Sequence, residues 1–177
     1  KSNKSSPNSY YFMKNTLFNK PLRVLRICPN INFGIGHNIK PFTKAISELG
    51  VEQTILSEGI DFKTKTPFSA FRQGFGVLKK IDYTKYDLIH LHNPSFWGVA
   101  LNAKGKIPTV TTFHGSLVFV SKFFYIKSVK QNIEYLINGF LSFIFSDYVI
   151  FVNKTDYDFF SKFSKKRFFV PTGYDPS

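Results

Sequence analysis

The sequence predicts an α/β fold, a Rossmann-like doubly wound parallel sheet with helices on both faces. Short segments rich in β-branched and apolar residues alternate with segments in which apolar residues recur at helical spacing. This strand–helix–strand unit repeats five times along the chain. The strand segments are almost continuously apolar, which is typical of strands covered on both faces in a parallel sheet.

The first strand is predicted at residues 22–28 (LRVLRIC), which are mostly branched and apolar. A glycine-containing turn is expected at 30–38. Apolar residues from Ile39 to Leu49 then follow at helical spacing and predict a helix, which Gly50 ends. Residues 51–56 (VEQTIL) predict the second strand.

The next unit begins with a stripe of phenylalanine and leucine over residues 68–78. Its helical spacing predicts a second helix, which Gly74 and Gly76 interrupt. The third strand is expected at 86–92 (YDLIHLH), and a short helix at 96–103.

The second half of the chain continues the alternation. Residues 107–113 (IPTVTTF) predict the fourth strand, and residues 148–152 (YVIFV) predict the fifth. A long helical pattern over 123–145 lies between them, with apolar residues on more than one face. A short helix at 156–163 and a short sixth strand at 168–171 complete the pattern.

The chain of 177 residues is long enough for one domain. Residues 1–20 hold four lysines and no acidic residue, which predicts a basic flexible arm or a segment added for expression. The domain itself is expected at 21–177. One cysteine, Cys28, excludes a disulfide framework and a cysteine-based zinc site. No apolar run reaches about 18 residues and no secretory signal is present, so a cytoplasmic location is expected.

A parallel sheet of this kind binds ligands beyond the carboxyl ends of its strands. The substrate-binding residues that this rule selects are Gly34, Ile35, Gly36, His92, Asn93, Gly115, Asn153 and Lys154. Gly34 and Gly36 would let the backbone approach a phosphate or sugar at a helix N-terminus, and an ordinary turn explains them equally well. Ile39 stands where a dinucleotide fingerprint needs its third glycine, which argues against NAD binding.

Histidines stand at two of the predicted strand ends. His90 and His92 lie on the same side of the third strand, where they could hold a metal. No third ligand is near in sequence, so burial with satisfied hydrogen bonds is the favoured interpretation. His114 leaves the fourth strand beside Gly115, which keeps it accessible. It could donate a hydrogen bond to a substrate oxygen, or it could serve in capping or packing.

Several segments, in order, resemble those of a known family. They are the glycine turn at 34–36, Glu-Leu-Gly-Val-Glu at 48–52, Tyr-Asp-Leu-Ile-His-Leu-His at 86–92, Pro-Thr-Val-Thr-Thr-Phe-His-Gly at 108–115, Ser-Asp-Tyr-Val-Ile-Phe-Val-Asn at 146–153 and Val-Pro-Thr-Gly-Tyr-Asp at 170–175. Over about residues 21–177 the chain resembles the N-terminal domain of a family-4 glycosyltransferase of the GT-B fold. It departs from the family at the first turn, where paired glycines are usual, at Asn153, where serine is usual, and at Thr172, where asparagine is usual.

The resemblance implies a retaining glycosyltransferase that moves a sugar from a nucleotide-sugar donor to an acceptor hydroxyl. It implies that this chain is the acceptor-binding half, that the C-terminal donor-binding domain is absent from it, and that the chain alone is inactive. His114 would then lie near the reaction centre, as the catalytic residue, with the turn at 34–36 facing the donor. No metal or other cofactor is expected. The alternative is a freestanding binding module for a sugar phosphate, an anionic lipid or a protein partner.

The formal charge of +13, from 24 basic and 11 acidic residues, needs an explanation. One explanation is peripheral contact with an anionic membrane, because aromatic and basic residues are interleaved over residues 121–145. A core-facing helix with a solvated charged face explains the same stretch. Nucleic acid is a less favoured partner, since the lysines are spread along the chain without a recognised motif. An acidic second domain could also balance the charge.

Overall fold

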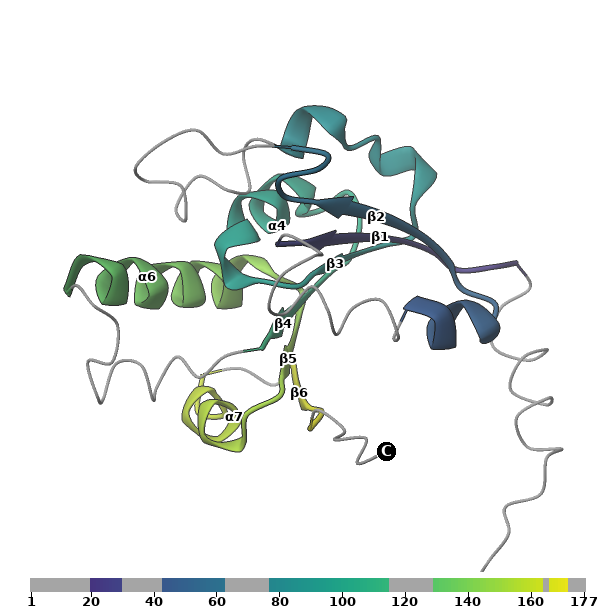
Figure 1. Ribbon diagram of the computed structural model, residues 1–177. Coiled ribbons are helices and arrows are strands. Elements are labelled where there is room, and N and C mark those ends of the chain that lie inside the picture. Colours follow the sequence, from purple (N-terminus) through teal and green to yellow (C-terminus); the bar gives the residue numbers. More distant parts are fainter. Residues whose placement is uncertain (1–19, 30–42, 63–76, 115–128, 164–165, 172–177) are drawn as a thin grey trace, which may run out of the picture.

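The computed structural model describes residues 20–29, 43–62, 77–114, 129–163 and 166–171. Its six strands form one sheet, all parallel, in the order β2-β1-β3-β4-β5-β6 (Figure 1). The strands are β1 (Arg23–Cys28), β2 (Glu52–Ser57), β3 (Leu88–Leu91), β4 (Thr109–Phe113), β5 (Tyr148–Phe151) and β6 (Arg167–Phe169). The α/β, Rossmann-like fold predicted from the sequence is confirmed.

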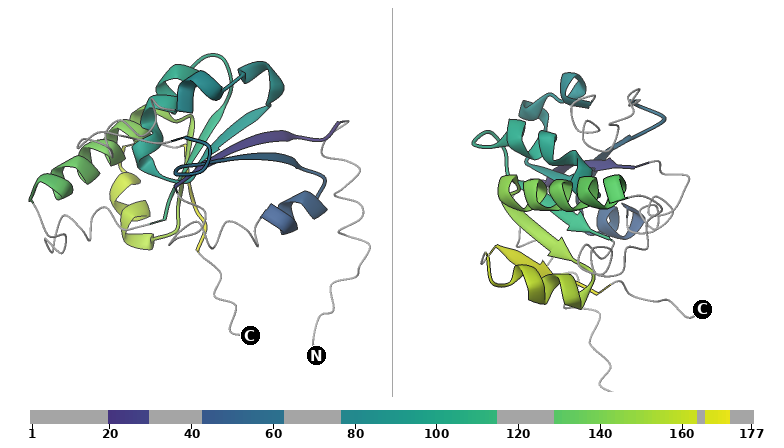
Figure 2. Two further views of the ribbon diagram at one scale, coloured as in Figure 1. Left: turned by 45° about the horizontal axis from the view of Figure 1, so that its top comes forward. Right: turned by 90° about the vertical axis from the view of Figure 1, so that its left-hand side faces the viewer.

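Helices cover both faces of this sheet. The 3₁₀ turns are η1 (Leu78–Lys80), η2 (Tyr83–Lys85) and η3 (Pro94–Phe96), and the α-helices are α4 (Trp97–Ala103), α6 (Val129–Phe145) and α7 (Lys154–Phe160). Residues 43–48 are also helical. α4, α6 and α7 lie on one side of the sheet, and residues 43–48 lie on the other (Figures 1 and 2).

The predicted elements agree with the described ones to within a few residues. α7 begins at Lys154, two residues before the predicted helix, because the side chain of Asn153 caps it there. β4 begins at Thr109 rather than at residue 107, and Pro108 between them has no N–H to contribute to a strand ladder. The predicted arm at 1–20 (except Lys20), the turn at 30–38, most of the helix at 68–78 and the first part of the helix at 123–145 lie outside the described residues.

One face of the sheet carries the apolar core. The main cluster on this face joins β1 and β3 to η3 and α4, and includes Leu25, Ile27, Ile89, Leu91, Phe96, Val99 and Ala100, all fully buried. A second cluster joins β4 and β5 to α7 through Phe113, Val149, Phe151 and Phe160. Removing this apolar surface from water is the main stabilising contribution to the fold.

The other face of the central strands carries polar side chains among apolar ones. Successive side chains of a strand point to opposite faces, so Arg26 of β1, His90 of β3 and Thr112 of β4 lie away from the main core. Arg26 is only 2% exposed. The face opposite the main core therefore combines buried apolar side chains, such as Val24 and Cys28 of β1, with buried polar groups that need partners.

The strand order reverses at β1: β2 pairs with one edge of β1, and β3 pairs with the other edge. Connections that leave the carboxyl ends of β1 and β3 therefore diverge. In open parallel sheets such a switch point opens a crevice where ligands bind. The structure thus directs attention to the carboxyl ends of β1, β3 and β4.

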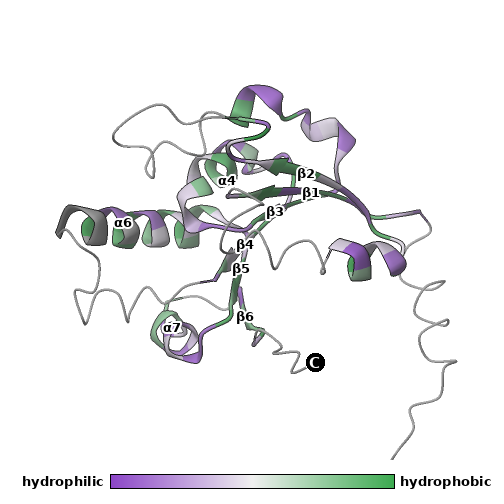
Figure 3. Cartoon of the chain, in the orientation of Figure 1, coloured by the Kyte–Doolittle hydropathy of each residue, from purple (hydrophilic) through white to green (hydrophobic). Residues whose placement is uncertain are grey.

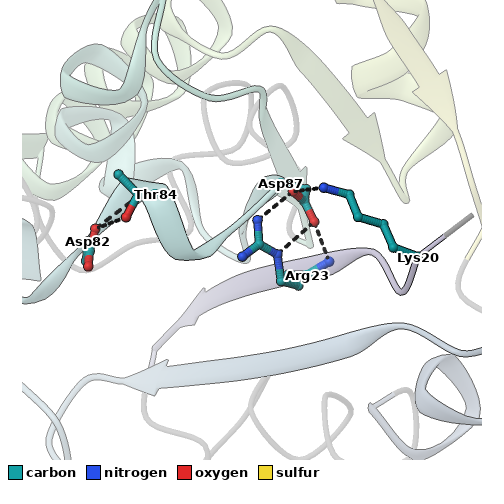
Figure 4. Close-up of polar contacts among 5 residues, drawn as sticks. All are labelled: Lys20, Arg23, Asp82, Thr84 and Asp87. Carbon is teal, nitrogen blue, oxygen red and sulfur yellow. Dashed lines mark hydrogen bonds and ion pairs between the residues drawn. The ribbon is translucent and has the colours of Figure 1, made fainter. Parts of the chain in front are cut away.

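Two aspartates join neighbouring strands at the opposite, amino-terminal edge. Asp87 accepts hydrogen bonds from the backbone N–H of Arg23 at 3.0 Å and from its guanidinium at 3.1 and 2.9 Å (Figure 4). Asp147 accepts from the backbone N–H and the hydroxyl of Thr109 at 2.8 and 3.0 Å. These carboxylates, from the motifs at 86–92 and 146–153, align β1 with β3 and β4 with β5.

α6 buries two polar side chains and exposes several apolar ones, while Phe143 and Phe145 pack against the core clusters. Asn138 and Ser142 are buried, and the indole N–H of Trp97 donates to Oδ1 of Asn138 at 3.0 Å. Among the described side chains of the helix, the exposed ones are Ile133, Ile137, Phe140 and Ile144. Hydrophobic and hydrophilic residues therefore interleave along α6 (Figure 3). Within the part of the chain that the structure describes, no helix is both long and apolar enough to cross a membrane.

Candidate functional site

Two histidines meet at the carboxyl edge of the sheet. His92 follows the last residue of β3, and His114 follows the last residue of β4. Nδ1 of His92 lies 3.1 Å from Nε2 of His114. The ring centroids are 5.4 Å apart and the ring planes lie at 21° to each other, so the two rings meet edge to edge. The structure thus brings together two of the residues that the strand-end rule selected from the sequence.

Arg26 of β1 completes this cluster. Its Nε and Nη2 both lie against Nε2 of His92, at 3.0 and 2.9 Å. Its Nη1 donates to Oγ1 of Thr43 at 3.1 Å and to Oε1 of Gln53 at 2.9 Å. Gln53 is held in turn, because its amide N–H donates to the backbone carbonyl of Thr43 at 2.8 Å. The guanidinium is therefore fixed from β2 and from the helical residues beside it.

Sequence reasoning did not select Arg26. The signal that could have found it is a charged residue inside an otherwise apolar strand, since a buried guanidinium needs polar partners. Its main partner, His92, lies 66 positions further along the chain. Among the described residues, none of the hydrogen-bond partners of Arg26 is acidic. Its positive charge therefore stands beside the histidines without a neighbouring carboxylate bonded to it.

Burial and the charge of Arg26 keep the histidines neutral. Burial is the main cause that lowers the pKa of His90 to about 3, and Arg26 adds to the effect. The pKa of His92 lies far below its ordinary value because of burial, His90 and Arg26. Burial and Arg26 also lower the pKa of His114. At neutral pH the three rings are therefore uncharged imidazoles.

His90 forms one wall of the cluster. Its Nε2 lies 2.7 Å from Oγ1 of Thr112, and its ring packs on that of His92 with centroids 4.0 Å apart. One ring nitrogen of His90 thus has a hydrogen-bond partner within the sheet. The described residues contain no group of three or more histidine, cysteine or acidic side chains that could hold a metal ion.

Asn93 and Asn153 use their side-chain oxygens as helix caps. Oδ1 of Asn93 accepts from the backbone N–H and the hydroxyl of Ser95 at 2.8 and 2.6 Å, where η3 begins. Oδ1 of Asn153 accepts from the backbone N–H groups of Thr155 and Asp156 at 2.8 and 3.3 Å, where α7 begins. The amide Nδ2 of each asparagine is then the group that it could offer to a ligand.

The other expected binding residues are placed only in part. Lys154 pairs with Asp158 at 2.5 Å, one turn further along α7. Gly34, Ile35, Gly36 and Gly115 lie outside the described residues.

The cluster can present a neutral hydrogen-bonding group at the carboxyl edge of the sheet. His92 is 4% exposed, whereas His114 is only partly buried and is the member of the chain Arg26–His92–His114 that a ligand can reach. A neutral imidazole with a positive charge behind it suits a hydrogen bond to a hydroxyl or to an oxygen that gains negative charge.

Residues 36–177 match the family model described as Glycosyltransferase Family 4. The matched span contains β2 to β6 and all three histidines of the cluster, and it begins after β1 and Arg26. No curated protein matches the chain.

Proposed function

The chain belongs to glycosyltransferase family 4, and from that premise we propose that it is the acceptor-side domain of a retaining enzyme. This enzyme moves a sugar from a nucleotide-sugar donor to an acceptor hydroxyl. Family membership supports glycosyl transfer in general. The observation that carries the finer proposal is the position of His114, partly exposed at the carboxyl end of β4 beside the switch point of the sheet.

The chemistry of such a transfer asks for positioning and charge stabilisation. The bond between the anomeric carbon and the departing diphosphate breaks, the acceptor oxygen bonds to that carbon, and the acceptor proton passes to the departing diphosphate. The transition state resembles an oxocarbenium ion, as in glycoside hydrolysis. His114 would donate a hydrogen bond to the transferred sugar, and the Nδ2 groups of Asn93 and Asn153 would bind substrate oxygens at the same edge.

Residues 1–177 alone are proposed to be inactive. By resemblance to the family, most of the nucleotide-sugar site belongs to a second, C-terminal domain, and this chain supplies the acceptor side together with the turn at 34–36. No metal is assigned a role. Experiments on transfer therefore need the full-length protein.

Replacing His114 in the full-length protein tests the proposal. The assay measures release of nucleoside diphosphate from a panel of nucleotide sugars in the presence of sugar and lipid acceptors. His114→Ala is expected to lower kcat on the order of 10²-fold, the usual cost of losing one donor that stabilises a transition state. His114→Asn is the matched variant, because its amide N–H can stand near the position of the ring Nδ1–H and should retain more activity.

Three results would contradict parts of this proposal. Unchanged kcat in His114→Ala, with an unchanged unfolding midpoint, would remove His114 from the site. Turnover by residues 1–177 alone would show that the chain is not merely an acceptor half. A folded full-length protein that releases no nucleoside diphosphate from any donor, yet binds a sugar phosphate or a partner, would favour the binding-module alternative.

We also propose that the enzyme contacts an anionic membrane through an outer-face stripe. The stripe consists of Ile133, Ile137, Phe140 and Ile144 on α6 with Phe159 and Phe163 at α7, all exposed. Phe140 and Phe159 both pack on Phe160, at 5.5 and 5.2 Å between ring centroids, which connects the two helices. Lys104 and Lys166 line a pocket of about 180 Å³ with Ile144 at one end of the stripe. Exposed apolar groups beside lysines, on a chain of charge +13, suit an anionic bilayer surface.

Cosedimentation of the full-length protein with lipid vesicles tests this contact. Binding is expected to vesicles that contain phosphatidylglycerol and to be weak with phosphatidylcholine alone. Ile137→Ser combined with Phe140→Ser should weaken binding several-fold, whereas Leu101→Ser removes an exposed apolar side chain outside the stripe and should not. No binding, or equal binding to both vesicles, would contradict the proposal and would leave a second domain or a protein partner to cover the stripe.

A further inference from the structure

Arg26 determines the protonation pattern of His92. A guanidinium carries N–H donors and no acceptor. Nε and Nη2 of Arg26 both lie against Nε2 of His92, at 3.0 and 2.9 Å, so this nitrogen holds a lone pair. His92 is buried and neutral, and its single proton therefore lies on Nδ1.

His92 determines the protonation pattern of His114 in turn. Nδ1 of His92 faces Nε2 of His114 at 3.1 Å and donates its proton to that contact. A ring nitrogen that accepts a hydrogen bond carries no proton, so neutral His114 holds its proton on Nδ1. A second proton, on Nε2, would set two N–H groups against each other and would also face the charge of Arg26. The order of donors and acceptors thus runs in one direction, from β1 to the carboxyl end of β4.

We propose that Arg26 and His92 are positioning residues that lock His114 in the Nδ1–H tautomer, so that the ring nitrogen of His114 that does not contact His92 can offer a substrate a hydrogen-bond donor and no acceptor. The substrate group at this point is then an oxygen that accepts, such as a sugar hydroxyl, a carboxylate or a phosphate. The role in sugar transfer rests on the proposed function, whereas the tautomer itself does not.

Arg26 contributes charge as well as direction. Hydrogen bonds in a chain polarise one another, so a cation at one end of the chain makes the N–H of His114 at the other end a stronger donor. Thr43 and Gln53 hold the guanidinium at 3.1 and 2.9 Å. The donor of His114 is therefore oriented before a substrate arrives, which is the condition under which such a group stabilises developing charge.

Nitrogen NMR of the full-length, substrate-free protein, labelled in its histidine rings, reads the tautomer directly. The chain contains four histidines, and the signals that disappear in His114→Gln identify those of His114. At neutral pH, Nδ1 of His114 is expected to carry the proton and Nε2 to be bare, the reverse of the preference of a free imidazole. The opposite tautomer, or a rapidly exchanging mixture, would overturn the proposal.

Variants of the two positioning residues test the relay. Arg26→Met is expected to abolish the preference of His114 for Nδ1–H and to lower kcat about ten- to a hundredfold with little change in KM, as is typical when a partner that orients a functional group is lost. Arg23→Met is the matched control, because this arginine lies three residues earlier on β1 and bonds Asp87 instead. It should leave the tautomer unchanged.

His92 variants keep the test decisive even where Arg26→Met fails to fold. His92→Gln retains an oxygen that can accept from Arg26 and an N–H that can donate to His114, so it should preserve the tautomer and most of kcat. His92→Leu retains neither and should lose both. A tautomer of His114 that is the same in wild type, His92→Gln and His92→Leu would overturn the proposal.

The two readouts separate this inference from the proposed function. If His114 shows the Nδ1–H tautomer but the full-length protein transfers no sugar, the relay is supported and the proposed function is contradicted. If sugar is transferred while His114 shows the Nε2–H tautomer, the relay is overturned and the proposed function is supported.

Discussion

At the scale of a single residue, Asn153 caps a helix and is also proposed to bind substrate, and substitutions can distinguish these two roles. Its Oδ1 caps α7 through two backbone N–H groups, at 2.8 and 3.3 Å. Its Nδ2 is the group proposed to bind a substrate oxygen. Serine is usual at this position in the family that the chain resembles, and serine is also a good helix cap. Capping and binding therefore make different predictions for alanine and serine.

Asn153→Ala is expected to lower the free energy of unfolding by about 1 kcal/mol, because two N–H groups of the first turn of α7 lose their acceptor. Asn153→Ser is the matched variant and should retain most of the stability. Urea unfolding of the two variants measures the difference. If the Asn153→Ala variant is as stable as wild type, the cap is unimportant. If the Asn153→Ser variant keeps the stability of wild type but loses sugar transfer, Asn153 also binds substrate.

At the scale of an element, α7 is attached to the sheet by an aromatic cluster. Phe160 is 2% exposed and packs on Phe113, Phe143 and Phe151, with ring centroids 6.2, 5.1 and 5.3 Å away. These side chains come from β4, α6 and β5, so one ring joins four elements. The cap and the cluster together fix where α7 leaves the carboxyl end of β5.

Phe160→Ala is expected to lower the free energy of unfolding by about 3–5 kcal/mol, because the cavity it leaves cannot be filled by its aromatic neighbours. Phe163→Ala is the matched control, since this ring lies three residues further on and is 60% exposed. Its loss should change stability by less than about 1 kcal/mol. Equal effects of the two substitutions in urea unfolding would show that the cluster does not anchor α7.

At the scale of the whole molecule, neutral histidines beside a buried arginine make stability depend on pH. The folded-state pKa is lowered for His92 and His114 and is about 3 for His90, by burial first and by Arg26 in addition. Their unfolded values are about 6.5. The unfolded chain therefore binds protons first as the pH falls, and folding stability is full above about pH 6.5 and is lost below it.

The free energy of unfolding is accordingly expected to fall between about pH 6.5 and pH 5. The limiting slope is about 1.4 kcal/mol per pH unit for each histidine that titrates only when unfolded. Urea midpoints at about pH 7, 6 and 5 measure this slope, and a variant without the ring of His90 should show a shallower one. A flat profile over this range would mean that the histidines titrate normally in the folded protein.

Asp87 makes folding stability depend on pH in a separate range. Hydrogen bonds from Arg23 hold the pKa of this carboxyl far below its ordinary value of 3.8 (Figure 4). A depressed carboxyl pKa stabilises the fold above the unfolded value and ceases to do so as the pH falls below about 3.8. Loss of stability between pH 6.5 and 5 therefore belongs to the histidines and not to this ion pair.

Local patterns in the sequence predict the fold class, the places of the strands and the positions of His92 and His114 at strand ends. These follow from local periodicity, because the spacing of apolar residues within ten or so positions reports helix or strand directly. The rule that ligands bind beyond the carboxyl ends of parallel strands then selects the loops without any knowledge of their contacts. Family motifs carried by the same strands agree with that selection.

The contacts between side chains from different elements depend on how the sheet and its helices assemble. Arg26 and His92 are 66 positions apart, and their contact depends on the register of β1 against β3. The tautomer of His114 depends on that contact in turn. The same holds for α6, whose pattern has apolar residues on several faces, so only its packing against η3 and α4 selects which of them face solvent. Strand register and helix packing join residues that are far apart in the sequence, so no local pattern predicts these contacts.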